Sequence, residues 1–407
     1  MKVSSGVIGS LTNINEPINI FGGGICGLLF AYKLKANGYD VRLYEKEPNL
    51  GGKIQTKSRA NGIVETGANA IFSSPEVIDL LDELEIDYIT ASKNLKRYIF
   101  RDNKARSNPL YFKEILTIIL NLFKRLPRSK EISVYDFFEP LLGKKVCEEV
   151  LGCAFNGIYA TSIKELDFNS IFKAKIKSKR YIGFFLELKK KRKKKNFKAQ
   201  SLSFKSGMSE FILKLKEVLK EEIYLNTNKE LDPKELNIVC TDSIDASILL
   251  KDSHSYYSEL LEKIEYTNLN SFTVFSKQSI QELEGAFGIL FPYSQKKPLG
   301  ILNNTAIFEN RSKSQDINSY TFITKSHDLG ALAPEYIDQE SVLWARALPV
   351  YNLERTKIIK KLRAESYNHQ DKLIIFGNYV DGISIREMLG HIDQFVVSLC
   401  QNERQKT

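Results

Sequence analysis

The sequence predicts an α/β fold, and three observations near its start carry that prediction. A short apolar run, Ile18–Phe21, leads directly into a glycine motif of the form G-x-G-x-x-G. Apolar residues then recur at near-helical spacing until an Asn-Gly pair, which is a typical helix stop. A second apolar run, Val41–Tyr44, follows. Strand, glycine turn, helix and strand within about 30 residues are the dinucleotide-binding, Rossmann-like unit.

Each glycine of the motif has a separate physical role. Gly22 allows the tight turn, and Gly24 lets a pyrophosphate approach the backbone because it has no Cβ. Gly27 lets the helix pack close to the strand, and the helix N-terminus offers unpaired N–H groups to the phosphates. Glu45 ends the second strand, where an acidic side chain accepts hydrogen bonds from ribose hydroxyls. A dinucleotide site is therefore expected at this turn.

Composition is that of an ordinary globular protein. The chain has 407 residues, of which 43% are hydrophobic and 27% charged. It has no apolar run long enough to span a bilayer, and its first residues lack the pattern of a secretory signal, so a cytoplasmic location is expected. Five scattered cysteines favour reduced thiols, and four histidines show no metal-ligand spacing. No metal site is expected.

Two segments stand out by charge or hydropathy. Lys189–Lys195 (KKKRKKK) supplies most of the formal net charge of +10. A solvated loop is the favoured interpretation of this run, attraction to anionic lipid is an alternative, and no nucleic-acid partner is expected. Leu110–Leu126 is the most apolar helical segment and is followed by basic residues. It is too short to span a bilayer, so it is either a buried helix or one that lies on an anionic membrane surface.

The remaining pattern predicts helices and strands in turn. Ser74–Ile86 is predicted as a helix with Ser74 as its N-cap, and a hairpin is expected to turn at Asp102-Asn103. Further helices are expected at 134–141, 144–155, 244–250, 358–362 and 385–400, with mixed helical structure at 168–188 and a turn and helix at 202–221. Strands are expected at 223–226, 237–241, 271–276, 288–292, 300–303, 320–324 and 373–377.

The stretch after Glu45 indicates which dinucleotide binds. It contains Lys46, then Gly51, Gly52 and Lys53, and it resembles the second half of the fingerprint of flavin enzymes similar to amine oxidases. In those enzymes the Gly-Gly backbone also runs along the cofactor. NAD dehydrogenases generally lack this pair, so the resemblance implies that FAD is the cofactor.

Separate phrases along nearly the whole chain resemble oxygen-dependent protoporphyrinogen oxidases, which belong to the flavin amine oxidase superfamily. The phrases occur in the same order as in that family. They are VETGAN (64–69), LGCAFNGIYATSIKELDFNSIF (151–172), SFKSGMSEF (203–211), GAFGILFPYSQKKPLGILNNTAIFENR (285–311), WARALPVYN (344–352) and FGNYVDGISIREML (376–389).

The resemblance also implies roles for particular residues. Arg97 matches an arginine that contacts a substrate propionate, Phe287 and Leu290 match residues that sandwich the macrocycle, and Gly157 lines the same pocket. The flavin carries the chemistry, so no catalytic side chain is assigned. Further cofactor contacts are implied by the phrases after residues 66 and 376, the second of which opens a helix toward the flavin: Gly67, Ala68, Asn69, Gly377, Asn378, Gly382, Ile383 and Ser384.

The implied architecture is amine oxidase-like: a Rossmann-like FAD-binding domain (1–75, 200–252 and 350–407), a helical insertion associated with a membrane (76–199), and a mixed-sheet substrate domain (253–349). The implied reaction oxidises protoporphyrinogen IX or coproporphyrinogen III to the porphyrin in haem biosynthesis. Hydrides pass to the flavin in three two-electron steps, and O2 is the acceptor.

The implied location is the inner face of the cell membrane, as a peripheral protein, and a homodimer is left open. Two alternatives to the porphyrinogen oxidase are left open as well. One is another flavin enzyme, an amine oxidase or a carotenoid desaturase. The other is a noncatalytic FAD-binding protein whose basic loop, Lys189–Lys195, binds nucleic acid or lipid.

Overall fold

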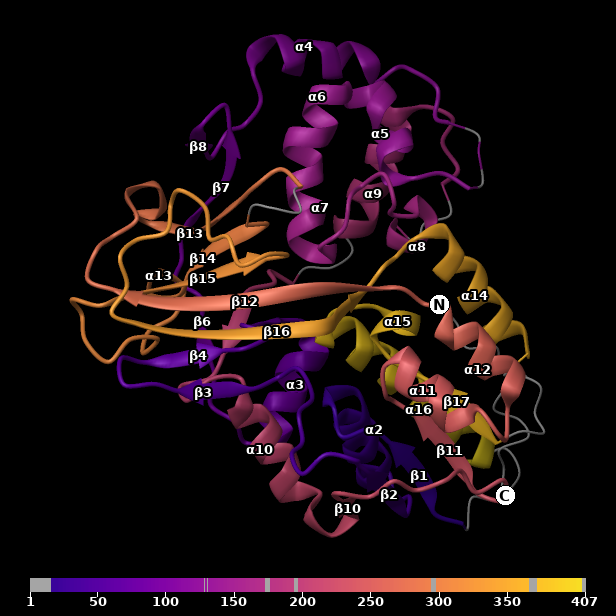
Figure 1. The fold of residues 1–407 in the computed structure, drawn as a ribbon. Coiled ribbons are helices and arrows are strands. Elements are labelled where there is room, and N and C mark those ends of the chain that lie inside the picture. Colours follow the sequence, from indigo (N-terminus) through magenta and orange to yellow (C-terminus); the bar gives the residue numbers. More distant parts are fainter. Residues whose placement is uncertain are drawn as a thin grey trace.

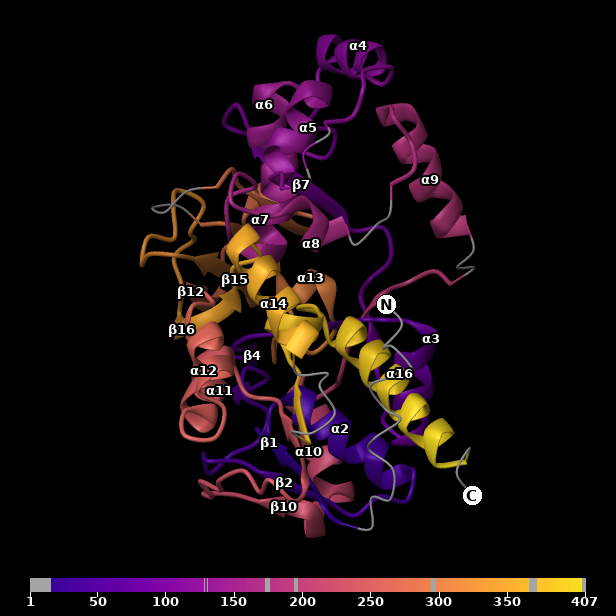
Figure 2. The ribbon, with the colours of Figure 1, turned by 90° about the vertical axis from the view of Figure 1, so that its right-hand side faces the viewer.

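The structure is a computed structural model, and it describes residues 16–127, 129, 131–172, 176–193, 197–293, 298–365 and 372–404. Lys194 and Lys195 of the predicted basic run lie outside these residues. Figure 1 shows three stacked parts: helices α4 to α9 at the top, the long strands β12 and β16 across the middle, and a sheet containing β1, β2 and β11 at the bottom. Figure 2, turned by a quarter, shows the same order.

The lower sheet is parallel, and it contains the predicted strand–turn–helix–strand unit. Its strand order is β10-β2-β1-β11-β17. All of these pairings are parallel, and β1 is hydrogen-bonded to both β2 and β11. The strands span Ile223–Tyr224 (β10), Val41–Tyr44 (β2), Ile18–Phe21 (β1), Leu236–Val239 (β11) and Leu373–Ile375 (β17). The predicted strands Ile18–Phe21 and Val41–Tyr44 are confirmed.

Helices cover both faces of this sheet, so β1 and β11 are buried at every position, as is typical of a parallel sheet. Ile18 and Ile20 of β1 face one hydrophobic cluster, whereas Phe21 faces the other. The first cluster is formed with α2 (Ile25–Ala36), α3 (Pro75–Glu83), α10 (Ser209–Val218) and α16 (Ile385–Arg404). The second is formed with α11 (Ser243–Leu250), α12 (Ser255–Glu262) and α14 (Leu353–Glu365).

The second sheet is mixed, as predicted, with the order β16-β12-β15-β14-β13-β7-β8. Only the β13–β7 pair is parallel; the other pairs are antiparallel. The strands span Asp338–Pro349 (β16), Tyr266–Ser276 (β12), Asn318–Thr324 (β15), Gly300–Asn303 (β14), Ala286–Leu290 (β13), Lys96–Arg101 (β7) and Lys104–Arg106 (β8). The short helix α13 (Asn304–Ile307) follows β14.

The upper part is helical and is held by an aromatic core. Its helices are α4 (Phe112–Asn121), α5 (Val134–Leu142), α6 (Lys144–Val146), α7 (Gly152–Tyr159), α8 (Phe168–Phe172) and α9 (Tyr181–Lys193), with a π-helical turn at Cys147–Leu151 between α6 and α7. The rings of Phe137 and Phe168 stack with centroids 3.7 Å apart, and Phe184 meets Phe137 edge to face. This cluster joins α5, α8 and α9.

Short elements connect the three parts. They are β3 (Thr56–Ser58) paired with β4 (Ile63–Glu65), the small sheet of β5 (Ile71–Phe72), β9 (Ser201–Ser203) and β6 (Ile89–Thr90), and α15 (Asn378–Asp381). Short 3-10 turns lie at Lys220–Glu222 and Gln281–Leu283. Among the described residues, every helix is too short or too polar to cross a bilayer.

Local signals in the sequence have the predicted structural effects. The Ser74 hydroxyl accepts a hydrogen bond from the Val77 N–H at 3.4 Å and caps α3. The β7–β8 hairpin turns at Asp102 and Asn103, whose φ angles of 50° and 57° are the left-handed values that Asp and Asn tolerate. The apolar helix α4 is shorter than the predicted segment Leu110–Leu126.

Several elements differ from the sequence prediction. Strand β16 and helix α12 were not expected, and the helix predicted at 144–155 contains a π-helical turn and continues to Tyr159. Strands β7 and β8, inside the predicted helical insertion, join the second sheet. Helix α12, beyond the predicted limit at residue 252, packs with α11 in one cluster. The domain limits remain a prediction.

Candidate functional site

The four neighbouring strands β2, β1, β11 and β17 all end at the same edge of the lower sheet, because all run parallel. Each is followed there by residues that leave the sheet: Glu45, Gly22, Thr241 and Gly377. In open parallel sheets ligands bind at the carboxyl ends of the strands. This edge is therefore where a cofactor is expected to bind.

The geometry of the glycine turn fits a pyrophosphate. Gly22 has a φ of +104°, and a Cβ there would lie 3.0 Å from Cγ2 of Thr241. A Cβ on Gly27 would collide with the Gly22 carbonyl oxygen, so α2 needs glycine to pack on β1. A Cβ on Gly24, by contrast, would meet no protein atom within 4 Å. Open space thus lies beside the α2 N-terminus, where N–H groups and the helix dipole favour an anion.

Glu45, the acidic residue expected to bind the ribose hydroxyls, is held at this edge by two backbone hydrogen bonds. One carboxylate oxygen of Glu45 accepts the Gly23 N–H at 2.6 Å, and the other accepts the Glu47 N–H at 2.9 Å. Each carboxylate oxygen can accept more than one hydrogen bond, so both retain capacity for ribose hydroxyls. The Gly51 N–H donates to the Gly23 carbonyl at 2.8 Å, which lays Gly51 and Gly52 alongside the glycine turn.

Lys46 and Lys53, the two lysines expected to contact the cofactor, differ in their surroundings. Lys46 is exposed and pairs with Asp245 of α11 at 2.7 Å, which raises the pKa of Lys46. Lys53 donates to the backbone carbonyl of Arg346 on β16, and burial lowers the pKa of Lys53. A Cβ on Gly67 would collide with the Lys53 carbonyl, so the two segments touch through their backbones. The half-buried residues Ala68 and Asn69 follow directly.

The C-terminal phrase places a turn and a helix start near the same edge. Gly377 has a φ of +150°, and a Cβ there would lie 3.5 Å from the Thr241 carbonyl oxygen. The Tyr351 hydroxyl donates to the Asn378 carbonyl. At the start of α16 the Ser384 hydroxyl accepts the Glu387 N–H at 3.2 Å. The remaining members of the phrase are Gly382, with a φ of +124°, and Ile383, which packs against the aromatic core of the upper part.

The structure brings the four predicted substrate residues to one strand, β13. Arg97 on β7 pairs with Gly288, and its guanidinium carbon lies 4.4 Å from the ring centroid of Phe287. On α7, a Cβ added to Gly157 would lie 2.7 Å from Cδ2 of Leu290. Strand β13 is thus bordered by Arg97, which lies over Phe287, and by the backbone of α7 at Gly157, which lies against Leu290. We call this surface the β13 wall.

Sequence reasoning missed several residues at the cofactor edge. Arg346 on β16 pairs with Asp242 at 2.8 Å and with Asp245 at 3.2 Å, so a strand of the second sheet is tied to α11. The Trp344 indole N–H donates to the Thr66 carbonyl at 2.7 Å. The phrase WARALPVYN contains both β16 residues, and Asp242 precedes a helix as a typical N-cap, so signals existed for each.

The fold and the glycine-lined edge are those of a dinucleotide-binding protein with an amine oxidase-like architecture. Residues 20–84 match the model of an NAD(P)-binding Rossmann-like domain. The fold is shared with a protein from Exiguobacterium sp. 255-15 (TM-score 0.75, 16% identity, covering 95% of this chain and 98% of that one). It is also shared with a putrescine oxidase (TM-score 0.68, 11% identity, 95% and 99%). The predicted fold class is confirmed.

Particular relatives are named by sequence. The chain is 24% identical to protoporphyrinogen oxidase 2 of Arabidopsis thaliana, with 91% of each chain covered. It is 27% identical to coproporphyrinogen III oxidase of Staphylococcus aureus, over 57% of this chain and 59% of that one. The predicted resemblance to protoporphyrinogen oxidases is confirmed, and with it the predicted enzyme class, an FAD-dependent oxidoreductase.

Proposed function

We propose that the protein oxidises a porphyrinogen, protoporphyrinogen IX or coproporphyrinogen III, to the porphyrin in haem biosynthesis. The observation that carries this proposal is the β13 wall. It offers the half-buried apolar side chains of Phe287 and Leu290 and a cation, Arg97, held over the ring of Phe287. A porphyrinogen is a broad apolar macrocycle with carboxylate arms, so it needs both features.

The cofactor edge supports FAD as the resident group. The open space at Gly24 would take the pyrophosphate, Glu45 the ribose hydroxyls, and the segments at Gly51-Gly52 and Gly377-Asn378 would border the rest. When bound, the flavin would accept two electrons with each hydride and pass them to O2. The chain's own part is to hold the cofactor, orient the substrate and keep the two in contact.

Substrate orientation is the role proposed for the β13 wall. The exposed guanidinium of Arg97 can form a bidentate pair with a propionate and so fix the rotation of the macrocycle in the pocket. Leu290 and Phe287 would contact the ring faces. Gly157 has no side chain, and any larger residue would displace Leu290 because its Cβ would lie 2.7 Å from that side chain.

Turnover under air tests the proposed function. Purified protein with bound FAD should convert protoporphyrinogen IX or coproporphyrinogen III to the fluorescent porphyrin with release of H2O2. Boiled protein and protein stripped of FAD control for spontaneous oxidation. If the porphyrin forms no faster than in these controls with either substrate, the proposal is wrong.

Replacing Arg97 by alanine should weaken substrate binding and leave FAD in place. The loss of one charge-assisted pair is worth about 1.5–3 kcal/mol, so KM should rise about 10- to 100-fold. Arg97→Lys should restore part of the loss. Arg106→Ala is the matched control, since Arg106 on the neighbouring strand also lies over a ring, that of Tyr111. Loss of flavin absorbance from the Arg97 variant would refute a role confined to substrate.

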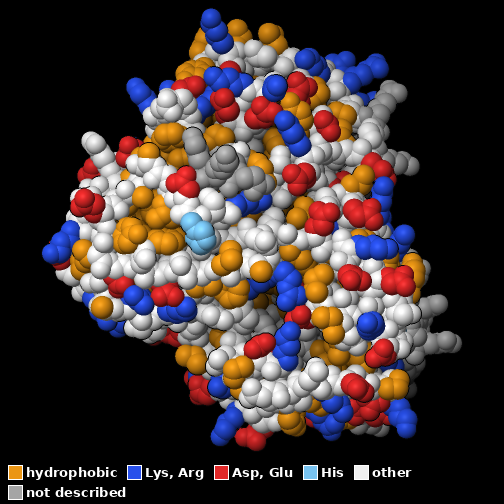
Figure 3. Space-filling model, in the orientation of Figure 1, with side chains coloured by type: hydrophobic (Ala, Val, Ile, Leu, Met, Phe, Trp, Pro, Cys, Tyr) orange, Lys and Arg blue, Asp and Glu red, His pale blue; other side chains and the backbone are white. Residues whose placement is uncertain are grey.

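We also propose that α4 binds an anionic membrane surface. Its apolar side chains are exposed rather than buried: Phe112 is 80% exposed, Leu120 67% and Phe123 56%. Lys113, Lys124 and Arg125 lie on or next to this helix, and Figure 3 shows hydrophobic and basic side chains side by side along the upper edge of the molecule. Apolar burial together with basic residues is how interfacial helices bind lipid.

Replacing two exposed apolar residues of α4 by serine should reduce membrane binding. The variant Phe112→Ser/Leu120→Ser removes two exposed apolar side chains and should lower co-sedimentation with anionic vesicles by about tenfold or more, because each buried side chain contributes about 1.5–3 kcal/mol. The matched control is Leu213→Ser/Ile248→Ser, since these residues are 63% and 68% exposed on other helices. Equal loss in both variants, or none in either, would contradict the proposal.

A further inference from the structure

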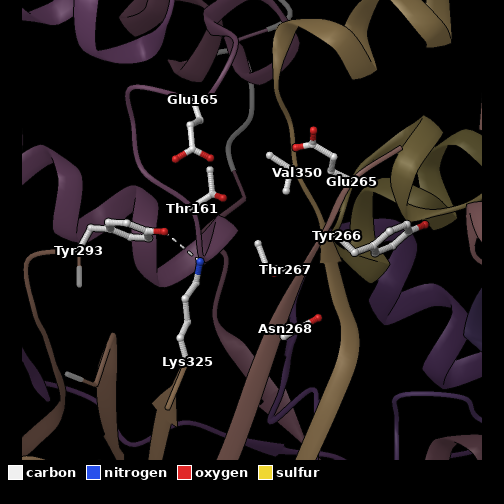
Figure 4. Close-up of a pocket in the computed structure, with 9 residues that line it drawn as sticks. All are labelled: Thr161, Glu165, Glu265, Tyr266, Thr267, Asn268, Tyr293, Lys325 and Val350. Carbon is white, nitrogen blue, oxygen red and sulfur yellow. Dashed lines mark hydrogen bonds between the residues drawn. The ribbon is translucent and has the colours of Figure 1, made fainter. Parts of the chain in front are cut away.

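One cavity of the molecule is not used by the site described above. It has a volume of about 360 Å³ and lies between the segment after α7 and the ends of strands β12 and β15. Lys325 reaches it from the end of β15, and Thr161 and Glu165 reach it from the loop after α7. Figure 4 shows Lys325 extended toward Tyr293 and Thr161, with Glu265 across the cavity.

The register of the second sheet places Lys325 on the same face as the β13 wall. Leu290 is paired with Gly300, and Gly300 with Ile323, so the side chains of this row share one face. Lys325 follows Ile323 by two residues and so returns to that face. On the helix side, Gly157 abuts Leu290, and Thr161 lies four residues further along the chain, just beyond the end of α7 at Tyr159. The cavity therefore lies on the same face of the sheet as the β13 wall.

The cation in the cavity is presented in the same way as Arg97. The Lys325 ammonium donates to the Tyr293 hydroxyl at 3.0 Å and lies 4.9 Å from the centroid of its ring. In the described part of the chain, neither Lys325 nor Arg97 forms an ion pair with a carboxylate. A half-buried or exposed cation over an aromatic ring, with no carboxylate partner, is suited to a ligand carboxylate.

The two cations stand at opposite ends of the wall. Phe287, under Arg97, lies near the start of β13, and Tyr293, beside Lys325, lies after its end, with Leu290 between them. Phe287 and Tyr293 are six residue steps apart, which span at most about 20 Å of extended chain. That length suits a macrocycle with a carboxylate arm directed toward each end.

We propose that Lys325 binds a second substrate carboxylate, at the edge of the macrocycle opposite the one that Arg97 binds. This inference rests on the proposed function. Coproporphyrinogen III carries a propionate on each of its four rings and can meet both cations. Protoporphyrinogen IX carries two propionates on neighbouring rings and can meet only one end. The site therefore selects coproporphyrinogen III, and Lys325 is a specificity-determining residue.

The cavity also contains two carboxylates, and removing the charge of one of them provides a second test of the proposal. Glu165 and Glu265 border the cavity, and the Glu265 carboxylate accepts a hydrogen bond from the Asn352 amide at 3.3 Å. Their negative charge opposes a substrate carboxylate. Neutralising Glu165 as Glu165→Gln should therefore lower KM for coproporphyrinogen III, whereas a cationic ligand would be bound less well by this variant.

The experiment compares both porphyrinogens with the wild type, Lys325→Met and Lys325→Arg, all as FAD-loaded protein. Lys325→Met should raise KM for coproporphyrinogen III about tenfold, leave KM for protoporphyrinogen IX and both kcat values within about twofold, and weaken binding of coproporphyrin III measured by flavin fluorescence. Lys325→Arg should retain binding. Lys277→Met is the matched control, because Lys277 also follows a strand of this sheet directly, β12, and is exposed.

Three results would overturn the inference while the proposed function stands: equal KM changes for the two porphyrinogens, no change for either, or a higher KM for coproporphyrinogen III in Glu165→Gln. A wild type with the higher kcat/KM for protoporphyrinogen IX would also overturn it. Oxidation of neither porphyrinogen by the wild type would overturn the proposed function and this inference together.

Discussion

Gly24→Val should abolish FAD binding without unfolding the protein. A Cβ at Gly24 meets no protein atom within 4 Å, and its φ of −70° and ψ of 174° are open to any residue. The valine side chain would instead fill the space at the α2 N-terminus that the pyrophosphate needs. Losing one or two hydrogen bonds to a charged group costs about 3 kcal/mol, so FAD affinity should fall about a hundredfold or more.

Flavin absorbance of the purified variant and its melting temperature, measured on FAD-free protein, check this expectation. Gly390→Ala is the matched control, because a Cβ there also meets no atom within 4 Å and Gly390 lies on α16, in a helix interior. The control should keep both FAD and stability. Normal FAD content in Gly24→Val would place the cofactor elsewhere, and unfolding of its FAD-free form would show that the space is needed by the protein itself.

Arg311→Met should destabilise the protein by about 3 kcal/mol or more. Arg311 and Glu65 are each 3% exposed, and their charged groups are 3.6 Å apart. Arg311 also donates to the Ser203 hydroxyl at 2.5 Å, so this pair joins the segment after α13 to strands β4 and β9. Removing the cation would leave a buried carboxylate with hydrogen bonds from Thr56 and Met208 but without its countercharge.

The control for this variant is an arginine paired at the surface. Arg59 lies 2.6 Å from Asp338 and 3.2 Å from Glu340, and its side chain is 37% exposed. Arg59→Met should destabilise the protein much less than Arg311→Met, because exposed ion pairs contribute little. Chemical denaturation of both variants measures the difference. A smaller loss for Arg311→Met than for Arg59→Met would contradict the proposed role of the buried pair.

The loss in Arg311→Met should also depend on pH. Burial raises the pKa of Glu65 above its usual value, and Arg311 opposes that rise. Without Arg311 the pKa of Glu65 in the folded state should rise further. A raised pKa in the folded state adds stability at acidic pH that is lost as the pH rises through that pKa. The deficit of the variant should therefore be smaller at about pH 5 than at about pH 7.5.

The parts of the fold that were predictable depend on neighbours in sequence. The strand at Ile18–Phe21, the cap at Ser74 and the hairpin turn at Asp102 each follow from residues a few positions apart. Strand β16 was not predicted because its exposed and half-buried residues alternate on a surface strand rich in polar side chains. Only its pairing with β12, about 70 residues earlier, makes it a strand.

The same division applies to the site. Gly22, Gly24 and Gly27 predict a dinucleotide site from the sequence because all three lie in one turn between a strand and a helix. The substrate residues were assigned only through resemblance, since Arg97, Gly157 and Leu290 meet through the register of a sheet and the packing of a helix on it. Lys325 carries no local signal at all. Its place beside the β13 wall depends on two strand pairings and on the segment after helix α7.

Anaerobic mixing of the FAD-loaded protein with coproporphyrinogen III, and separately with protoporphyrinogen IX, tests the central claim most directly. The account predicts that flavin absorbance is lost while porphyrin fluorescence appears, and that coproporphyrinogen III reduces the flavin at the lower concentration. Unchanged flavin absorbance with both porphyrinogens, in protein whose FAD can still be reduced by dithionite, would contradict it.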